Sequence, residues 1–286
     1  MISTTDTSSI GAPVWFISGC STGLGRAIGR AVIARGWNVV LTARDPTSLE
    51  DLRAEGGDRA LALRLDVTSA DQIISAVDRA EARFGRIDVL VNNGGYGYAS
   101  VVELAQDAQV RALFETNVFG LIRLTQAVLP GMRQRRRGHV INIGSIAGVI
   151  SGASSGFYSA TKHAVEAVTE ALAAEGAGLN IKATVVEPAT FSTDFISRSL
   201  KSTPVTVPEY QESVRAFTHQ ADALVKDRRP GDPAKGAAAI LDCTLLDHPP
   251  LRLPLGMDAC PRLEEAIRHR LAELDAWRDV AAAAAG

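Results

Sequence analysis

Six short apolar runs alternate with longer amphipathic stretches, and this alternation constrains the fold of the chain more than any other feature of its sequence. The runs are rich in Val, Ile and Leu and hold few charges, which is typical of strands buried on both faces. The pattern predicts an α/β fold, a Rossmann-type doubly wound parallel sheet flanked by helices on both faces. The predicted strands are Val14–Ser18, Asn38–Thr42, Ala60–Leu65, Val89–Asn92, His139–Ile143 and Ala183–Val186, and the predicted helices are Gly25–Arg35, Ser69–Phe84, Ala108–Pro130, Tyr158–Gly176, Pro233–Leu246 and Leu263–Val280.

The composition excludes several classes of protein. Hydrophobic residues make up 46% of the chain, which is too many for a disordered protein. The net charge of −2 gives no general attraction to nucleic acid or anionic membranes, and we interpret the basic run at 133–137 as a solvated face. Three scattered cysteines are too few for a disulfide framework or a zinc cluster. Because we find no signal peptide and no apolar run of ~20 residues, we expect a cytoplasmic protein with no metal and with no nucleic-acid or membrane partner.

A glycine-rich loop follows the first predicted strand and leads into a helix. Gly19, Gly23 and Gly25 allow a tight turn, a close approach of the backbone to phosphate, and close packing of the helix on the strand. The N-terminus of the helix offers free N–H groups and the positive end of a dipole to a pyrophosphate. We therefore favour a dinucleotide site over a simple turn. The residues of this loop that we predict to bind the dinucleotide are Gly19, Ser21, Thr22, Gly23, Leu24 and Gly25.

The end of the second strand indicates which dinucleotide binds. Arg44 follows this strand, and Ala43 occupies the place where a ribose-binding carboxylate is common. A guanidinium suits the 2′-phosphate of NADP, so the sequence favours NADP(H) over NAD(H). The alternative is that Arg44 merely pairs with Asp45 on the surface.

Two more strand ends carry candidate cofactor residues. Asp66, followed by Val67, is expected to accept a hydrogen bond from the adenine amino group, or else to be the acid at a helix N-terminus. Asn93, Gly94 and Gly95 follow the fourth strand, where small residues let the backbone approach a ligand and asparagine can tie adjacent loops together. The alternative is a plain turn, because Asn and Gly dominate turns.

A serine, a tyrosine and a lysine form the candidate catalytic group. Ser145 follows the fifth strand, and Tyr158 and Lys162 are four residues apart, on one face of a predicted helix. A phenol has a reference pKa of about 10. A nearby ammonium and an oxidised nicotinamide would favour phenolate and lower the pKa of Tyr158, which tunes it for proton transfer.

Together these motifs resemble those of the short-chain dehydrogenases/reductases, in the subfamily built on one domain, over about residues 14–260. The glycine loop matches the family pattern Thr-Gly-x-x-x-Gly-x-Gly with Ser18 in place of Thr, and Asn-Asn-Ala-Gly appears with Gly94 in place of Ala. Asn117 falls at the family's helix asparagine. Pro188 and Thr193 match Pro-Gly-x-x-x-Thr, in which Ala189 replaces the glycine.

The resemblance implies a role for each matched residue. Tyr158 is the general acid in carbonyl reduction and the base in alcohol oxidation, and Ser145 hydrogen-bonds the substrate oxygen. Lys162 lowers the pKa of the tyrosine and holds the nicotinamide ribose, while Asn117 positions a water that relays protons. Thr193, after Pro188, holds the nicotinamide carboxamide, and the cofactor supplies the hydride.

The substrate is expected to be a lipophilic ketone, aldehyde or secondary alcohol, because the residues beside the motifs are mostly apolar. These candidate pocket residues are Tyr96, Ala147, Val149, Phe191 and Phe195. Resemblance to steroid- and retinoid-type members points the same way. Two other functions stay open: a sugar-nucleotide epimerase or dehydratase on the same fold, and a non-catalytic dinucleotide-sensing protein.

All of these motifs converge on one cofactor, so we interpret residues 1–286 as one NAD(P)-binding domain. Within it we expect a flexible N-terminus at 1–12, a substrate lid at 191–229, which could instead be a surface excursion, and a C-terminal helix and tail at 257–286. The resemblance implies a homodimer or homotetramer through the helices Ala108–Pro130 and Tyr158–Gly176.

Overall fold

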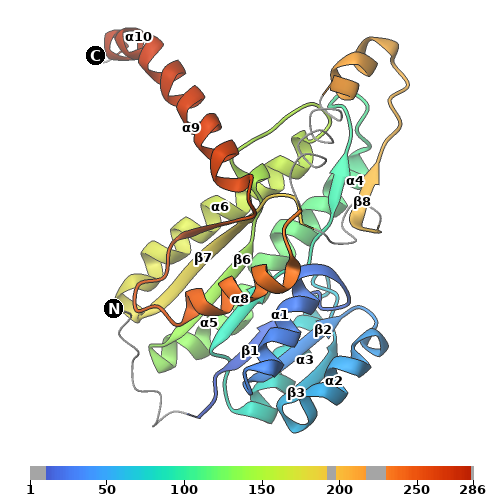
Figure 1. Cartoon of the computed structure of the whole chain (residues 1–286), viewed down its shortest axis with the longest axis vertical. Coiled ribbons are helices and arrows are strands. Elements are labelled where there is room, and N and C mark those ends of the chain that lie inside the picture. Colours follow the sequence, from blue (N-terminus) through green and yellow to red (C-terminus); the bar gives the residue numbers. More distant parts are fainter. Residues whose placement is uncertain (1–10, 192–197, 217–229, 285–286) are drawn as a thin grey trace.

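A computed structural model of the chain describes residues 11–191, 198–216 and 230–284. Its main sheet has seven parallel strands in the order β3-β2-β1-β4-β6-β7-β9 (Figure 1). The strands are β1 Val14–Ile17, β2 Asn38–Ala43, β3 Ala60–Arg64, β4 Val89–Asn92, β6 Gly138–Ile143, β7 Ile181–Pro188 and β9 Arg252–Leu255. This architecture confirms the predicted doubly wound parallel sheet.

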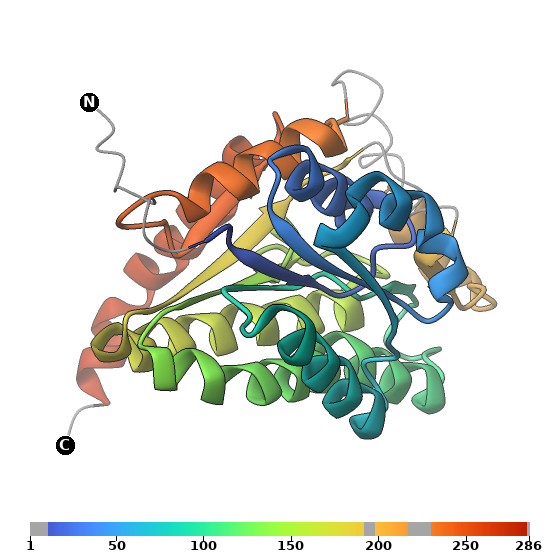
Figure 2. The same cartoon turned by 90° about the horizontal axis from the view of Figure 1, so that it is seen from below.

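Helices cover both faces of the sheet. Seen from below, α1, α2 and α8 lie on one face and α3, α5 and α6 on the other (Figure 2). The α-helices are α1 Gly23–Ala34, α2 Glu50–Gly56, α3 Ala70–Phe84, α4 Asp107–Phe114, α5 Leu121–Arg135, α6 Gly156–Gly176, α8 Pro233–Thr244, α9 Ala259–Ala276 and α10 Arg278–Ala283. Because each strand is parallel to its neighbours, the carboxyl ends of all seven meet at one edge, which is where ligands bind in open sheets of this kind.

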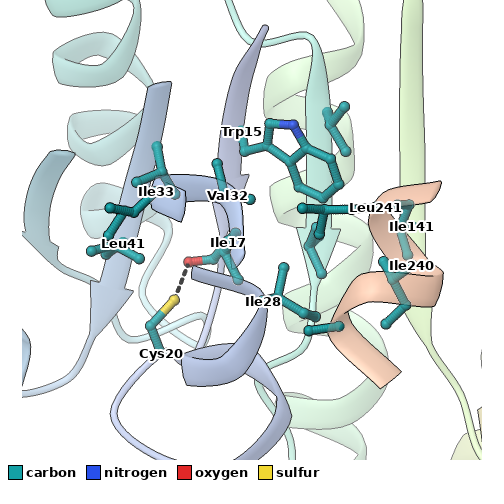
Figure 3. Close-up of a cluster of buried hydrophobic side chains, with 14 of the residues drawn as sticks. Trp15, Ile17, Cys20, Ile28, Val32, Ile33, Leu41, Ile141, Ile240 and Leu241 are labelled. Carbon is teal, nitrogen blue, oxygen red and sulfur yellow. Dashed lines mark hydrogen bonds between the residues drawn. The ribbon is translucent and has the colours of Figure 1, made fainter. Parts of the chain in front are cut away.

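The core is divided by the sheet, as continuous apolar strands require. On β1, Trp15 and Ile17 face α1 and α8, whereas Phe16 faces the opposite layer. Figure 3 shows Trp15 and Ile17 among Ile28 of α1 and Ile240 of α8, all with an exposed fraction of 0%. This packing fixes the strand from which the glycine-rich loop departs.

The predicted helix Ala108–Pro130 is longer and less regular than expected. The structure has α4, a π-helical segment η3 at Glu115–Gly120, and α5, which continues past Pro130 to Arg135. A Cβ atom on Gly120 would lie 2.8 Å from Cγ2 of Val67, so only glycine lets η3 pack this closely on the segment after β3. Single π-helical turns are frequent at functional sites.

Several elements of the structure were not predicted from the sequence. The edge strand β9 carries a charge and a proline in only four residues, and α2 is one short helix before β3. A second small sheet pairs β5 (Gly97–Ala99) with β8 (Leu200–Ser202) in parallel. β8 lies in the predicted lid, of which 192–197 and 217–229 are outside the described residues, as are 1–10 of the predicted flexible N-terminus.

The region in which a C-terminal helix and tail were predicted, 257–286, contains the two helices α9 and α10. Figure 1 shows α9 leaving the sheet as a rod, and from Ile267 to Ala284 every described residue is exposed. Within the described ranges, no helix combines the length and the apolar character that a membrane span requires.

Candidate active site

The glycine-rich loop lies directly against the loop after β4. Gly19 has a φ of +75°, and a Cβ atom on it would lie 2.9 Å from Cα of Gly94. A Cβ on Gly25 would lie 2.3 Å from Nδ2 of Asn93. Glycine is therefore required at both positions, which matches the expected tight turn and close helix packing.

The N-terminus of α1 suits a pyrophosphate. The helix starts at Gly23, and its N-cap residue Thr22 makes no capping side-chain hydrogen bond among the described residues. Its first turn also holds no acidic residue. The N–H groups of this turn and the positive end of the dipole thus remain available to an anion. The residues present fit a dinucleotide, and Ser21, Thr22 and Leu24 lie at the start of this helix, as predicted.

Asn93 ties the two loops together. Its Nδ2 donates to the carbonyl oxygens of Ser18, at 3.0 Å, and Gly19, at 2.8 Å. Oγ of Ser18 accepts from the backbone N–H groups of Asn93 and Gly94, both at 3.0 Å. This network shows the expected link between the loops. The hydroxyl of Ser18, which a threonine would also supply, makes two of these contacts.

The end of β2 presents an exposed guanidinium. Asp45 does not pair with Arg44 among the described residues; instead Oδ1 of Asp45 accepts from the backbone N–H and the hydroxyl of Thr47, at 3.0 and 2.7 Å. These bonds hold the pKa of Asp45 below its usual value. Arg64 at the end of β3 lies opposite Ala43 in the sheet register and brings a second exposed cation to this end of the sheet, which sequence analysis missed.

The segment after β3 is held by a local turn. Oδ1 of Asp66 accepts from the backbone N–H of Thr68 at 2.9 Å and from its hydroxyl at 2.8 Å, just before α3. These contacts agree with the alternative in which Asp66 is the acid near a helix N-terminus. Val67 packs between Gly120 and Gly94, so it braces the loop after β4. A bond from Asp66 to adenine stays a prediction.

Tyr158 and Ser145 are brought together at the carboxyl end of the sheet. Ser145 follows β6 and caps the short helix η4 (Ile146–Gly148), where its Oγ accepts from the N–H of Ala147 at 3.1 Å. Burial raises the pKa of Tyr158 to about 12, and a hydrogen bond with Ser145 opposes that shift. In the protein alone, desolvation of the phenolate outweighs the hydrogen bond with Ser145, whereas the lowering expected from an ammonium together with an oxidised nicotinamide stays a prediction.

Lys162 lies beside Tyr158 but binds the main chain. Its Nζ donates to the carbonyl oxygen of Ile143 at 2.7 Å and is 5.7 Å from the centre of the Tyr158 ring. Burial lowers the pKa of Lys162 to about 8, and the carboxylate of Glu166 opposes that shift. The pair thus consists of a protonated phenol and an ammonium whose pKa lies closer to neutrality than that of a free lysine.

Asn117 is buried in η3 and joins three elements. Its Oδ1 accepts from the N–H of Tyr96 at 3.0 Å, and its Nδ2 donates to the carbonyl oxygen of Tyr96 at 2.8 Å and to Oγ1 of Thr161 at 3.2 Å. The side chain therefore fixes the loop at Gly95 to α6 next to Lys162. A role in holding a relay water stays a prediction.

The candidate pocket residues do not all share one environment. Val149 packs with Ile146 and with Leu263 of α9, so the base of α9 lies against the loop of Ser145. Tyr96 lies under Nζ of Lys201, 4.7 Å from its ring centre. Leu263 and Lys201 were both missed, because only the fold brings them here. Ala147 lies in η4, half-buried.

Phe191, which follows β7, packs against α8 and the segment just before it. The ring of Phe191 packs on Gly231 and Gly236, where added Cβ atoms would lie 2.9 and 2.7 Å from it. Oγ of Ser145 donates to the carbonyl oxygen of Pro188 at 3.5 Å. Thr193 and Phe195 are outside the described residues.

Comparison with known proteins gives consistent matches. The family described as short chain dehydrogenase matches residues 13–203. An oxidoreductase, BOA17, of Botryotinia fuckeliana is 36% identical, over 95% of this chain and 99% of that protein. A 3-ketodihydrosphingosine reductase of Bacteroides thetaiotaomicron is 36% identical, over 84% of this chain and 86% of that protein.

Solved structures agree with this assignment. A short-chain dehydrogenase from Streptomyces avermitilis is 42% identical, with a TM-score of 0.89 over 96% of this chain and 99% of that one. An alcohol dehydrogenase from Thermococcus sibiricus, complexed with 5-hydroxy-NADP, is 25% identical, with a TM-score of 0.71 over 86% of this chain and 96% of that one. The chain therefore belongs to the short-chain dehydrogenase family and is an NAD(P)-dependent oxidoreductase that acts on alcohol or ketone groups.

Proposed function

We propose that the protein reduces a lipophilic ketone or aldehyde with NADPH, and oxidises the alcohol in reverse, with Tyr158 as general acid and base. The observation that carries this proposal is the buried, protonated phenol of Tyr158 hydrogen-bonded to Ser145. A carbonyl oxygen placed between these two hydroxyls would accept a hydrogen bond from each. As the oxygen gains charge, Tyr158 transfers its proton to it. When bound, the nicotinamide supplies the hydride.

The other residues of the site support this step. Lys162 stabilises the tyrosinate that remains after proton transfer, and its charge lies 5.7 Å from the ring. Asn117 and Ser145 position the reacting groups. The proposed cofactor-binding residues are Gly19, Ser21, Thr22, Gly23, Leu24, Gly25, Arg44, Asp66, Val67, Asn93, Gly94, Gly95, Tyr158, Lys162, Pro188 and Thr193.

A lipophilic substrate is favoured by the apolar side chains that cluster near Ser145. Ile146, Val149, Ile150 and Leu263 form one cluster at the base of α9, and burial of an apolar chain there is worth about 25 cal/mol per Å². A relative named as a 3-ketodihydrosphingosine reductase acts on a ketone of this character. The pocket set proposed from sequence is Tyr96, Ala147, Val149, Phe191 and Phe195.

We further propose a single domain over residues 1–286 and a homodimer or homotetramer. The α4–α5 face supports the oligomer, because Phe119 is 48% exposed and borders a hollow of about 620 Å³ lined also by Val110 and Phe114.

Activity is tested by following NADPH oxidation against a panel of aliphatic, sphingoid and steroid ketones. Wild type should turn over at least one lipophilic ketone, and Tyr158→Phe should bind NADPH with unchanged affinity but lose most turnover. Full turnover by Tyr158→Phe would refute the acid role, and binding of NADPH without turnover of any carbonyl would favour a dinucleotide sensor.

A further inference from the structure

Behind Lys162, on the face of α6 that packs on the sheet, lies a group of charges that the catalytic motifs do not include. Glu166 is one turn along α6 from Lys162, so Tyr158, Lys162 and Glu166 follow one another at intervals of four on the same face. Glu166 is 7% exposed. A carboxylate this deep in a protein needs a compensating charge.

Arg252 of β9 supplies that charge. Its Nε lies 3.1 Å from Oε2 of Glu166, and its Nη2 lies 3.1 Å from Oε2 of Glu170 on the next turn of the helix. The side chain of Glu170 is 63% exposed, whereas that of Glu166 is 9% exposed. One arginine therefore binds a buried and an exposed carboxylate of the same helix, which provides a matched pair of positions for mutation.

The side chain of Glu166 also packs against the loop that holds Ser145. A Cβ atom on Gly148 would lie 2.9 Å from Cγ of Glu166, and one on Gly144 would lie 3.4 Å from its Oε1. These glycines flank the segment that holds Ser145. Oε1 itself is buried and has no hydrogen-bond partner among the described residues.

The surroundings of Glu166 are mixed in charge. Burial raises its pKa and Arg252 opposes that shift; burial and the neighbouring Glu166 raise the pKa of Glu187 at the end of β7 to about 7. The charged and titratable groups facing Glu166 are Lys162, His163 and Glu170 of α6, Glu187 of β7 and Arg252 of β9. Among them, only Lys162 belongs to the catalytic motifs.

We infer that Glu166, clamped by Arg252, is a positioning residue that keeps Lys162 in its ammonium form beneath the active site. Lys162 is buried, and its bond to the carbonyl oxygen of Ile143 involves a neutral acceptor. Glu166 carries a negative charge one turn along α6 that favours this ammonium. This inference deepens the proposed function and rests on it for the kinetic consequence, but the charge state of Lys162 is a property of the protein alone.

The direct test is an NMR titration of the lysine Cε resonances in the full-length protein, with the Lys162 signal assigned by its loss in Lys162→Met. Removing an opposite charge disfavours the ammonium, so Glu166→Gln should lower the pKa of Lys162 by about one unit. Glu170→Gln removes a carboxylate from the same arginine and should leave that pKa unchanged. Glu166→Asp keeps the charge and should restore most of the wild-type value, which covers the case in which the glutamine variant folds poorly.

The kinetic test is the pH profile of kcat. Because the ammonium is the active form, the alkaline limb of Glu166→Gln should move to lower pH by the same amount, while that of Glu170→Gln stays in place. An unchanged Lys162 titration in Glu166→Gln, or equal shifts in both variants, would overturn the inference. If Tyr158→Phe proved fully active, the proposed function would fall, and the NMR titration would still decide the role of Glu166.

Discussion

Replacing Asn117 by alanine should destabilise the protein strongly, because this side chain makes three hydrogen bonds at a buried position. Two go to the backbone N–H and carbonyl of Tyr96 and one to Oγ1 of Thr161, and Asn117 is 3% exposed. Each buried hydrogen bond contributes about 1 kcal/mol, and the backbone groups of Tyr96 would lose their partner. We therefore expect Asn117→Ala to lower the free energy of unfolding by about 3 kcal/mol.

The assay is urea unfolding followed by circular dichroism, with thermal unfolding as a second measure. A loss of about 3 kcal/mol corresponds to a fall in Tm of roughly 6–12 °C for a chain of this size. Thr161→Val is the matched control. It removes the third bond and also the bond that Oγ1 of Thr161 donates to the carbonyl oxygen of Tyr158 at 2.7 Å, so it should cost about 2 kcal/mol. The double variant should cost about 1 kcal/mol more than Asn117→Ala, since both single changes remove the bond between Asn117 and Thr161 and only the bond to Tyr158 is lost in addition.

The reasoning fails if Asn117→Ala loses less than about 1 kcal/mol, or if both single variants lose the same amount. Either result would mean that the loop at Gly95 is held to α6 by packing and not by this side chain. Turnover adds a second readout. A stable Asn117→Ala protein that keeps wild-type kcat would remove Asn117 from the proposed machinery as well.

Three further predictions follow from the site and the core. Arg44→Ala should weaken NADPH binding by about 10–100-fold, because a charge-assisted phosphate contact is lost, and should leave NADH binding unchanged. Titration calorimetry with both cofactors checks this. An equal loss of affinity for both cofactors would exclude a contact between Arg44 and the 2′-phosphate. Burial raises the pKa of Cys20 to about 12, so a maleimide at pH 7 should label the exposed Cys260 and spare Cys20 in mass spectra. Burial lowers the pKa of His139 from 6.5 to about 3. Because the unfolded chain then binds a proton that the folded chain does not, the free energy of unfolding should fall as the pH drops from 6.5 towards 3. His139→Gln should make that fall smaller, as measured by urea unfolding at successive pH values.

The sheet was predictable where a strand is buried on both faces and less so at its edges. β1 reads as a strand because Trp15, Phe16 and Ile17 are all apolar, and each is fully buried. β9 has Arg252 and Pro254 in four residues, a pattern that no strand signal matches, and its pairing with β7 depends on packing after the chain has folded.

The candidate site shows the same contrast between residues that the sequence could place and contacts that only the fold creates. Spacing along the helix placed Lys162 beside Tyr158, because both lie on one element. The sequence also places Glu166 on that face, but it cannot show that Arg252, 86 positions later, binds it. The rise in the pKa of Tyr158 caused by burial was not predicted, since the degree of burial is a property of the folded chain and not of the motif.

The position of Arg252 in the last strand has a consequence for synthesis on the ribosome. Every residue of the catalytic motifs, from Gly19 to Lys162, has been made long before Arg252 emerges, and the family match itself ends at residue 203. A nascent or truncated chain can thus hold all the motifs while Glu166 still lacks its arginine. A fragment of this chain that carries the whole signature therefore still lacks the arginine that pairs with Glu166.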